Sequence, residues 1–306
     1  MLINKIFYTL KPAVPRWFQI FLRRRIALYK RKKYSHIWPI DPNAGAPPKG
    51  WQGWPDNKKF ALVLTHDVDT QQGHNRVFQL AKIEEDHGFQ SSFNFVPERY
   101  TVSEGLRNEL VSKGFEVGVH GLNHDGKLYS SKEIFKRRAA KINEYLKDWK
   151  AVGFRSPAMH HNLDWIHHLN IEYDASTFDT DPFEPQSDGV GTIFPFWVRD
   201  MTTQNEYLEL PYTICQDFTL FIIMKENGID IWKKKLDWIV SRGGMVLINT
   251  HPDYMNFNER MQGIEEYPVE YYIEFLDYIM DVYKGAYWNT IPKNVAKFWK
   301  EQHIYT

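Results

Sequence analysis

The sequence predicts an α/β fold built on a parallel sheet, because short apolar segments alternate with segments of helical periodicity from residue 60 onwards. Repeated strand–helix units imply parallel strands joined by right-handed crossovers. Strands are expected at 60–65, 91–96, 115–119, 152–155, 171–175, 207–211 and 245–250. Helices are expected at 74–87, 103–113, 131–149, 162–169, 216–225, 229–241, 268–284 and 293–302. Seven strands of this kind favour a closed or nearly closed barrel over an open sheet, although the pattern alone does not decide between them.

The composition is that of a folded globular protein, with 43% hydrophobic and 25% charged residues. The single Cys215 excludes an internal disulfide, which fits a reducing compartment. No stretch approaches the roughly 18 apolar residues of a membrane span. Pro12 and Pro15 interrupt the region where a signal peptide has its apolar core. We therefore expect a cytoplasmic protein, at most peripheral at the inner face of the membrane.

Positive charge is concentrated at the start of the chain. Residues 1–40 hold ten Lys or Arg and no acid, so the other 28 basic residues face 38 acidic ones, a balance of −10. We expect residues 1–37 to form a basic, helical arm. Its apolar positions recur at helical spacing, at Phe18, Leu22, Ile26 and Tyr29. This periodicity fits a helix on an anionic membrane surface and equally a first helix docked on the domain, whereas nucleic-acid binding is not favoured because the remaining chain is acidic.

Two irregular segments flank or interrupt the predicted domain at 60–306. Residues 38–59 form a linker rich in Pro and Gly, and its Trp38, Trp51 and Trp54 either line a sugar groove or pin the linker to the body. We favour pinning, because aromatic side chains pack more often than they bind a ligand. Residues 176–206 are too long for a mere connection, and their aromatic side chains favour an ordered lid.

Two carboxylates follow the first buried strand. The run Phe60–Leu64 is apolar throughout and leads to Asp67 and Asp69. Residues two apart on a strand share a face, so both side chains can reach one site at the carboxyl edge of the sheet. A calcium-type loop or a helix N-cap is the alternative, but no further acids follow at the alternate positions that a calcium loop needs.

Two histidines follow another predicted strand. His120 and His124 are four residues apart, a spacing that directs both imidazoles the same way in a helical turn. The spacing alone is weak evidence for a metal site, but its place at a strand end strengthens it. Two imidazoles and one carboxylate suit a zinc-like ion with open positions, and a second carboxylate can then act as general base.

Arg155 and His251 end two later strands at the same edge. Arg155 can hold a carboxylate base through a bidentate pair, or can be a surface ion pair. His251 can give a proton to a leaving amine or alkoxide near neutral pH. The remaining candidates, His160, His161, His167 and His168, are interpreted as surface or packing residues.

Four motifs in this order resemble the polysaccharide deacetylase family, the NodB-homology domain. They are Thr65-His66-Asp67-Val68-Asp69, His120 to His124, Arg155-Ser156-Pro157 and Thr250-His251-Pro252. The resemblance covers about residues 60–300. It implies a distorted (β/α)7 barrel and a divalent ion, usually zinc. It also implies roles for six residues, with Asp69, His120 and His124 as metal ligands, Asp67 as base, Arg155 steadying it and His251 as acid.

Two positions depart from the family pattern, and the position of one further acid is left undecided. Val68 separates two Asp residues that are more often adjacent, and Gly121 stands where a Ser or Thr usually braces the loop. A further acid that tunes the catalytic His is expected among Asp174, Asp179 and Asp181.

The resemblance implies a metal-dependent hydrolase of carbon–nitrogen bonds that removes the N-acetyl group from an amino sugar of a polysaccharide or its biosynthetic intermediate. An O-acetyl esterase or a non-sugar amidase would use the same residues. A catalytically silent carbohydrate-binding or membrane-associated assembly protein is the alternative from another class. The Gly at 121 favours this alternative, and the full set of proton-transfer residues opposes it.

Overall fold

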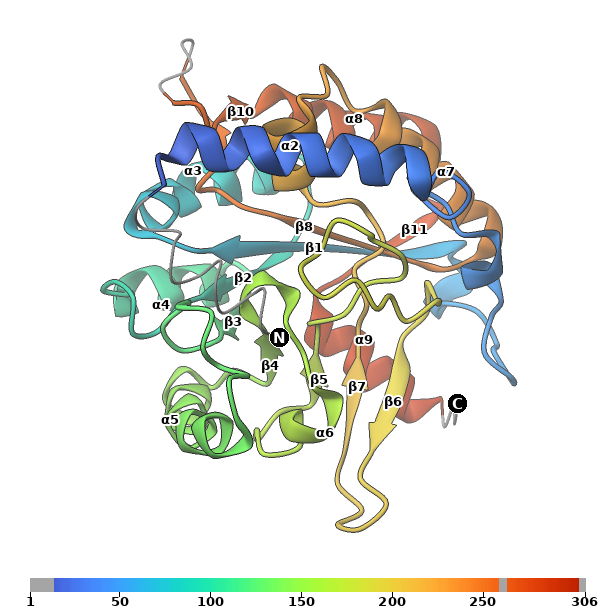
Figure 1. Ribbon diagram of the computed structural model, residues 1–306. Coiled ribbons are helices and arrows are strands. Elements are labelled where there is room, and N and C mark those ends of the chain that lie inside the picture. Colours follow the sequence, from blue (N-terminus) through green and yellow to red (C-terminus); the bar gives the residue numbers. More distant parts are fainter. Residues whose placement is uncertain (1–13, 259–262, 303–306) are drawn as a thin grey trace.

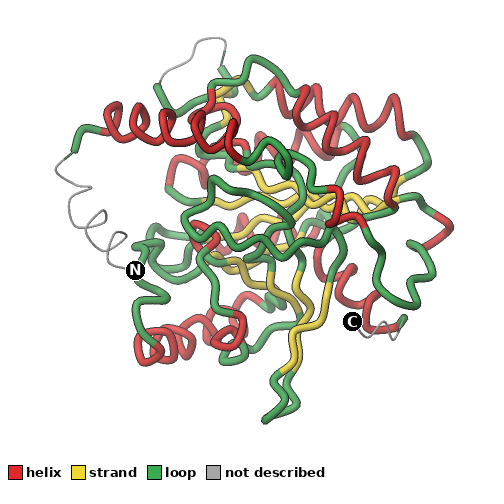
Figure 2. Tube along the Cα trace, turned by 45° about the vertical axis from the view of Figure 1, so that its right-hand side comes forward, coloured by secondary structure: helices red, strands yellow, loops and turns green. Residues whose placement is uncertain are grey.

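The computed structural model describes residues 14–258 and 263–302, and these form a curled parallel sheet with helices packed around it (Figure 1). Neighbouring strands in the sheet are β1 Phe60–Val68, β2 Ser91–Phe95, β3 Glu116–His120, β4 Gly153–Arg155, β5 Tyr173–Asp174 and β7 Glu206–Glu209. On its other edge β1 pairs with β8, Met245–Thr250. Figure 2 shows these strands at the centre of the molecule with helices outside them.

The two ends of the curled sheet meet just beyond β7. Ile214 forms a parallel bridge with Ile248 of β8, and the Thr213 amide donates to the Leu247 carbonyl at 2.9 Å. The ring therefore closes through a short contact rather than a full strand pair. This is the distorted (β/α)7 barrel that the sequence resemblance implied.

The helices follow the predicted positions closely. They are α3 Gln71–Asp86, α4 Glu104–Ser112, α5 Lys132–Trp149, α6 Leu163–Ile166, α7 Asp230–Arg242, α8 Glu270–Tyr283 and α9 Pro292–Glu301. Thr70, Ser103 and Ser131 cap the first three through their side-chain oxygens. Two predictions need correction, because the helix expected at 162–169 is the single turn α6 and the one at 216–225 is the π-helix η5, Phe218–Met224.

The predicted strand pattern misses four short strands. They are β6 Phe196–Arg199, β9 Met255–Asn256, β10 Tyr267–Pro268 and β11 Tyr287–Asn289. β6 pairs antiparallel with β7, and β11 pairs with the first residues of β1. Each has at most four residues and lacks the continuous apolar run of a central strand, so periodicity does not reveal it. The described residues also contain three single 3₁₀ turns, at Pro42–Gly45, Pro55–Asn57 and Pro157–Met159.

The tryptophans of residues 38–59 pack on the barrel. Trp54 is buried, donates its Nε1–H to the Gly243 carbonyl at 2.8 Å and lies beside Trp299 at 5.9 Å between ring centroids. Trp51 contacts the same Trp299 ring at 5.0 Å, and Trp38 meets Phe183 edge-on. These side chains hold the segment to the body, as the favoured interpretation predicts, and none of the three lines the cavity described below.

The basic arm contains the helix α2, Arg16–Lys33, which lies alongside the barrel and packs against η5 (Figure 1). Lys30 donates from Nζ to the Pro182 carbonyl at 2.6 Å, and Arg16 pairs with Glu265. The helix buries Gln19, Ile20 and Ala27 rather than the apolar positions predicted to form its face, which are all exposed. The part of the predicted arm at 1–13 lies outside the described residues. Among the helices described, none has the length and apolar character needed to cross a bilayer.

We expect Trp54→Ala to lower the free energy of unfolding by about 3–5 kcal/mol, because it leaves a cavity and an unpaired Gly243 carbonyl. Trp17→Ala is the matched control, since Trp17 is 63% exposed and Trp54 only 4%. Urea unfolding of both variants measures the difference. Equal unfolding midpoints would contradict the anchoring role of Trp54.

Candidate active site

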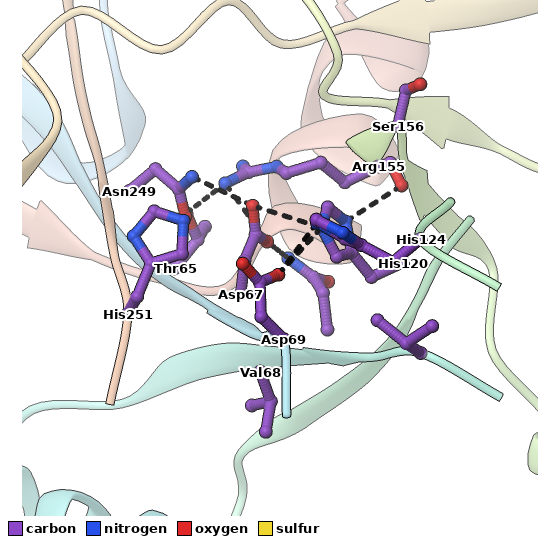
Figure 3. Close-up of polar contacts among 12 residues, drawn as sticks. Thr65, Asp67, Val68, Asp69, His120, His124, Arg155, Ser156, Asn249 and His251 are labelled. Carbon is purple, nitrogen blue, oxygen red and sulfur yellow. Dashed lines mark hydrogen bonds and ion pairs between the residues drawn. The ribbon is translucent and has the colours of Figure 1, made fainter. Parts of the chain in front are cut away.

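The six site residues predicted from the sequence converge at the carboxyl edge of the barrel (Figure 3). Asp67 lies near the end of β1 and Asp69 just after it, with exposed fractions of only 2% and 8%. His120 and Arg155 end β3 and β4, His251 directly follows β8, and His124 lies in the loop after β3. All except Arg155 line a cavity of about 660 Å³.

Asp69, His120 and His124 form a cluster that fits a divalent ion. The Nε2 atoms of His120 and His124 lie 3.3 and 3.1 Å from Asp69 Oδ1, and one ligand atom from each residue lies within 4.8 Å of the others. Although Oδ1 is buried, it has no hydrogen-bond partner within the described residues. His120 donates from Nδ1 to the Arg155 carbonyl at 3.1 Å, which directs Nε2 at the cluster.

The loop after β3 does not form the helical turn predicted for the two histidines. Gly121 and His124 have positive φ angles, +61° and +52°. Backbone of this kind turns the chain sharply and brings His124 back beside His120, with 5.2 Å between the ring centroids. A left-handed conformation is costly for a residue with a side chain, and such strain is typical of functional sites. The shared direction of the imidazoles therefore comes from a turn rather than a helix.

Asp67 is held by amides rather than by the arginine. Asn94 and Asn249 donate from Nδ2 to its two oxygens at 3.0 and 2.9 Å. Arg155 Nη1 is 3.6 Å away and donates instead to Thr65 Oγ1 at 2.9 Å, so the predicted bidentate pair is wrong. Burial raises the pKa of Asp67, but His120, Arg155, His251 and the hydrogen bond from Asn94 together outweigh it and keep the pKa below its ordinary value. Asp67 is therefore a carboxylate near neutral pH.

Asp217 is the acid that orients His251. Its Oδ1 accepts from His251 Nδ1, and its Oδ2 from the His251 amide, both at 2.7 Å. Tyr267 also donates to Oδ2, at 3.0 Å. Burial alone lowers the pKa of His251, but the charge and hydrogen bond of Asp217 raise it to about 10. The imidazole is therefore protonated at neutral pH.

The prediction that this acid lies among Asp174, Asp179 and Asp181 is wrong. Asp174 accepts from Ser176, Asp179 pairs with Lys235, and Asp181 accepts from Tyr212. Asp217 precedes an apolar helix, where an Asp is ordinarily an N-cap, and its Oδ1 also accepts from the Phe218 amide at 2.7 Å. The capping signal was present in the sequence, but nothing in it linked this residue to His251.

Further residues around the site were not predicted. Asp253 accepts from the Asp69 amide at 2.9 Å and from the Thr70 hydroxyl, so it fixes the chain directly after β1. Burial and the nearby Asp69 charge raise the pKa of Asp253 to about 6. In the sequence, Asn94 and Asn249 stand out only as polar residues within two strands that are otherwise buried.

The expected lid at 176–206 contributes to the cavity wall. Phe183, Glu184 and Pro185 line it, and Glu184 accepts from Tyr212 and Gln216 at 3.0 and 2.8 Å. Arg16, Arg23 and Lys30 of α2 line another part of the same cavity. The four histidines interpreted as surface or packing residues do not line it.

The geometry explains the glycine at position 121. A Cβ atom there would lie 2.5 Å from Pro157 Cγ and 2.6 Å from Pro157 Cδ. The positive φ and this contact together exclude the Ser or Thr that the family usually has. Gly121 donates its amide to the Arg155 carbonyl at 3.0 Å, so the loop is braced through its backbone. The residue is thus an adaptation of the loop, and it no longer favours a silent protein.

Gly121→Ser should destabilise the protein by about 1–2 kcal/mol through its left-handed backbone alone, with the Pro157 contact adding to this. Gly228→Ser is the control, because no atom lies within 4 Å of a Cβ at that position. Thermal unfolding and zinc titration would follow both variants. A Gly121→Ser protein as stable as the control and equally able to bind zinc would disprove the steric argument.

Asp217→Asn should lower the pKa of His251 from about 10, because only the charges of Asp69 and Asp67 then oppose the effect of burial. In the wild type, protonated His251 contributes stability that is complete below its ordinary pKa of about 6.5 and is lost as the pH rises through about 10. NMR titration of chelator-treated protein, with urea unfolding over the same pH range, measures both effects. Asp181→Asn is the control, and an unchanged pKa of His251 in Asp217→Asn would refute the pairing.

Comparison with known proteins supports the fold. No protein-family model matches the chain, and no curated protein does. A solved structure from Mycobacterium smegmatis assigned as a polysaccharide deacetylase is similar to it, with a TM-score of 0.64, 16% identity, and coverage of 85% of this chain and 96% of that one. The PuuE allantoinase has a TM-score of 0.64 at 16% identity, and the match covers 88% of this chain and 99% of that one. A protein of Pseudomonas aeruginosa PAO1 assigned as a polysaccharide deacetylase has a TM-score of 0.64 at 15% identity. The match covers 88% of this chain and 100% of that one. The chain therefore has the fold of the polysaccharide deacetylases.

Proposed function

We propose that this protein is a metal-dependent hydrolase that removes the N-acetyl group from an amino sugar of a polysaccharide or its biosynthetic intermediate. The observation that carries the proposal is the arrangement in one cavity of three groups. They are the Asp69, His120 and His124 cluster, the ionised Asp67, and the protonated His251. Together they provide a place for a cation, a proton acceptor and a proton donor.

The cation is a divalent ion, and we propose zinc. Two imidazole nitrogens and one carboxylate oxygen are the donor set of many catalytic zinc sites, which keep further positions open. When bound, such an ion lowers the pKa of water from about 15.7 to about 7 and stabilises negative charge on a carbonyl oxygen. Asp69 Oδ1, buried and without a hydrogen-bond partner in the described chain, fits this role.

Asp67 serves as the general base. Its pKa lies below the ordinary value, so it is ready to accept a proton from the attacking water. Asn94 and Asn249 fix both oxygens, and His120 Nε2 lies 3.9 Å from Oδ2, which places the carboxylate beside the cluster but outside it. Arg155 acts on it through charge rather than through a hydrogen bond.

His251 serves as the general acid. Asp217 holds Nδ1, and the imidazole lines the cavity with the cluster. As the carbonyl carbon gains an oxygen from water, its bond to nitrogen breaks and the nitrogen takes a proton from His251. The products are acetic acid, which releases its proton to solvent as acetate, and a free amino sugar, and the proton on Asp67 balances the one that His251 gave up.

An O-acetyl esterase or an amidase acting on a non-sugar compound would use the same groups. The fold is found in polysaccharide deacetylases and in an allantoinase, so likeness of fold does not choose among amide substrates. A silent binding protein is disfavoured, because sugar binding does not require a buried carboxylate base opposite a protonated imidazole.

Asp67→Asn should bind zinc but lose about 10²–10⁴-fold in rate, since general-base catalysis is worth that much. Asp69→Ala should lose both zinc and activity. Asp125→Asn is the control, because Asp125 also borders the cavity but pairs with Arg138. Zinc content by mass spectrometry and acetate release from chitin oligosaccharides provide the two measurements.

The same assay decides among the alternatives. Parallel reactions with O-acetylated sugars and with allantoin would identify an esterase or an allantoin amidase. Full activity of Asp69→Ala on any of these substrates would contradict the proposed metal site.

A further inference from the structure

The outward face of α2 is unusually apolar. Twelve large apolar side chains are exposed in the described residues, and seven of them lie on this one helix. They are Trp17, Phe18, Phe21, Leu22, Ile26, Leu28 and Tyr29, and all except Ile26, which borders the cavity, lie on the outward face. The other five are spread over the rest of the chain, at Phe78, Val111, Met201, Ile264 and Val282. Single exposed apolar residues are ordinary, whereas a contiguous group on one helix marks an interaction surface.

The same face is cationic. Arg24, Arg25, Lys32 and Lys33 are exposed between the apolar side chains, and α2 contains no acid. The guanidinium of Arg25 lies 5.4 Å from the centroid of the Phe21 ring. This combination of aromatic rings and long cationic side chains suits a boundary where apolar groups enter hydrocarbon and charges remain in water.

The helix is already fixed to the body by its opposite face. Gln19, Ile20 and Ala27 are buried, Arg16 pairs with Glu265, and Lys30 donates to the Pro182 carbonyl. The six outward apolar side chains are therefore not needed for docking the helix on the barrel, and they form a rigid surface rather than a loose arm.

We propose that the outward face of α2 binds the surface of an anionic lipid bilayer. The apolar side chains would enter the interface, and the four exposed cations would meet lipid phosphates. Charge supports this occupant, because residues 1–40 carry ten cations and no acid while the remaining chain has a balance of −10. An anionic surface would therefore attract the side of the molecule that carries α2.

A second copy of the chain fits this face poorly. Two α2 helices packed face to face would bring the cations of one against those of the other, with no acid on either helix to pair with them. Nucleic acid would use the cations but would leave the apolar side chains without a partner.

Docking in this way would place the candidate active site beside the membrane. Arg16, Arg23 and Lys30 on the inner side of α2 line the cavity that contains Asp69 and His120. The cavity would then lie one helix diameter, about 10 Å, from the bilayer surface. The membrane proposal does not depend on the proposed reaction, since it rests on the outer face alone.

Flotation of the full chain with vesicles tests the proposal. We expect strong binding to vesicles containing phosphatidylglycerol, weak binding to phosphatidylcholine vesicles, and a decrease of binding with salt. Phe18→Ser with Phe21→Ser should weaken binding at least about tenfold, and Arg25→Gln with Lys32→Gln about 30-fold.

The controls are matched in chemistry and exposure. Phe78→Ser removes a ring that is 46% exposed on α3, as Phe21 is on α2, and Lys136→Gln with Arg137→Gln removes two exposed cations from α5. Neither should change binding, and circular dichroism with urea unfolding verifies that every variant is folded. Absence of vesicle binding by the wild type, or retained binding by the α2 variants, would overturn the proposal. So would a dimer in sedimentation velocity that only the α2 variants abolish, because a second copy would then occupy this face.

Discussion

The burial of two carboxylates at the end of β1 is the constraint on which the site depends. Asp67 and Asp69 are almost completely removed from water, and an ionised carboxylate in such a place is costly unless donors or opposite charges surround it. Strands β2, β3, β4 and β8 each contribute such a group at the same edge. The barrel thus satisfies the two charges with side chains from separate strands, which is possible only because parallel strands present their ends together.

The two carboxylates are satisfied differently. Asp67 receives two amide hydrogen bonds and the field of Arg155, whereas Asp69 Oδ1 faces only imidazole nitrogens. This difference separates a base from a ligand, although Asp69 follows Asp67 by only two residues. His66, directly before Asp67, points the other way, where it pairs with the buried Glu84. The alternation of a strand therefore explains why one motif supplies both the site and the packing behind it.

Residues at the ends of long buried strands are the part of the site that sequence reasoning predicts well. Asp67, Asp69, His120 and His251 each follow or end an apolar run, so their convergence follows from the fold class. The partners that orient them were not predictable, because Asn94, Asp217 and Asp253 reach the site from elements unrelated in sequence spacing. Short strands such as β6 and β11 were missed for a similar reason, since pairing with a neighbour, not periodicity, makes them strands.

The orientation of α2 could not be predicted either, and it bears on the charge of the cavity. Helical periodicity marks Phe18, Leu22 and Ile26 as an apolar face that suits either a membrane surface or the domain. Contacts with η5 and Glu265 instead bury another side of the helix. Cations of α2 consequently line the cavity. A divalent cation would balance Asp67 and Asp69, and Asp217 already balances protonated His251. Burial and the neighbouring Asp181 raise the pKa of Glu184 to about 8, so this lid residue adds little negative charge at neutral pH. With the proposed ion bound, the cavity would therefore have cationic side chains on its α2 side and little uncompensated negative charge.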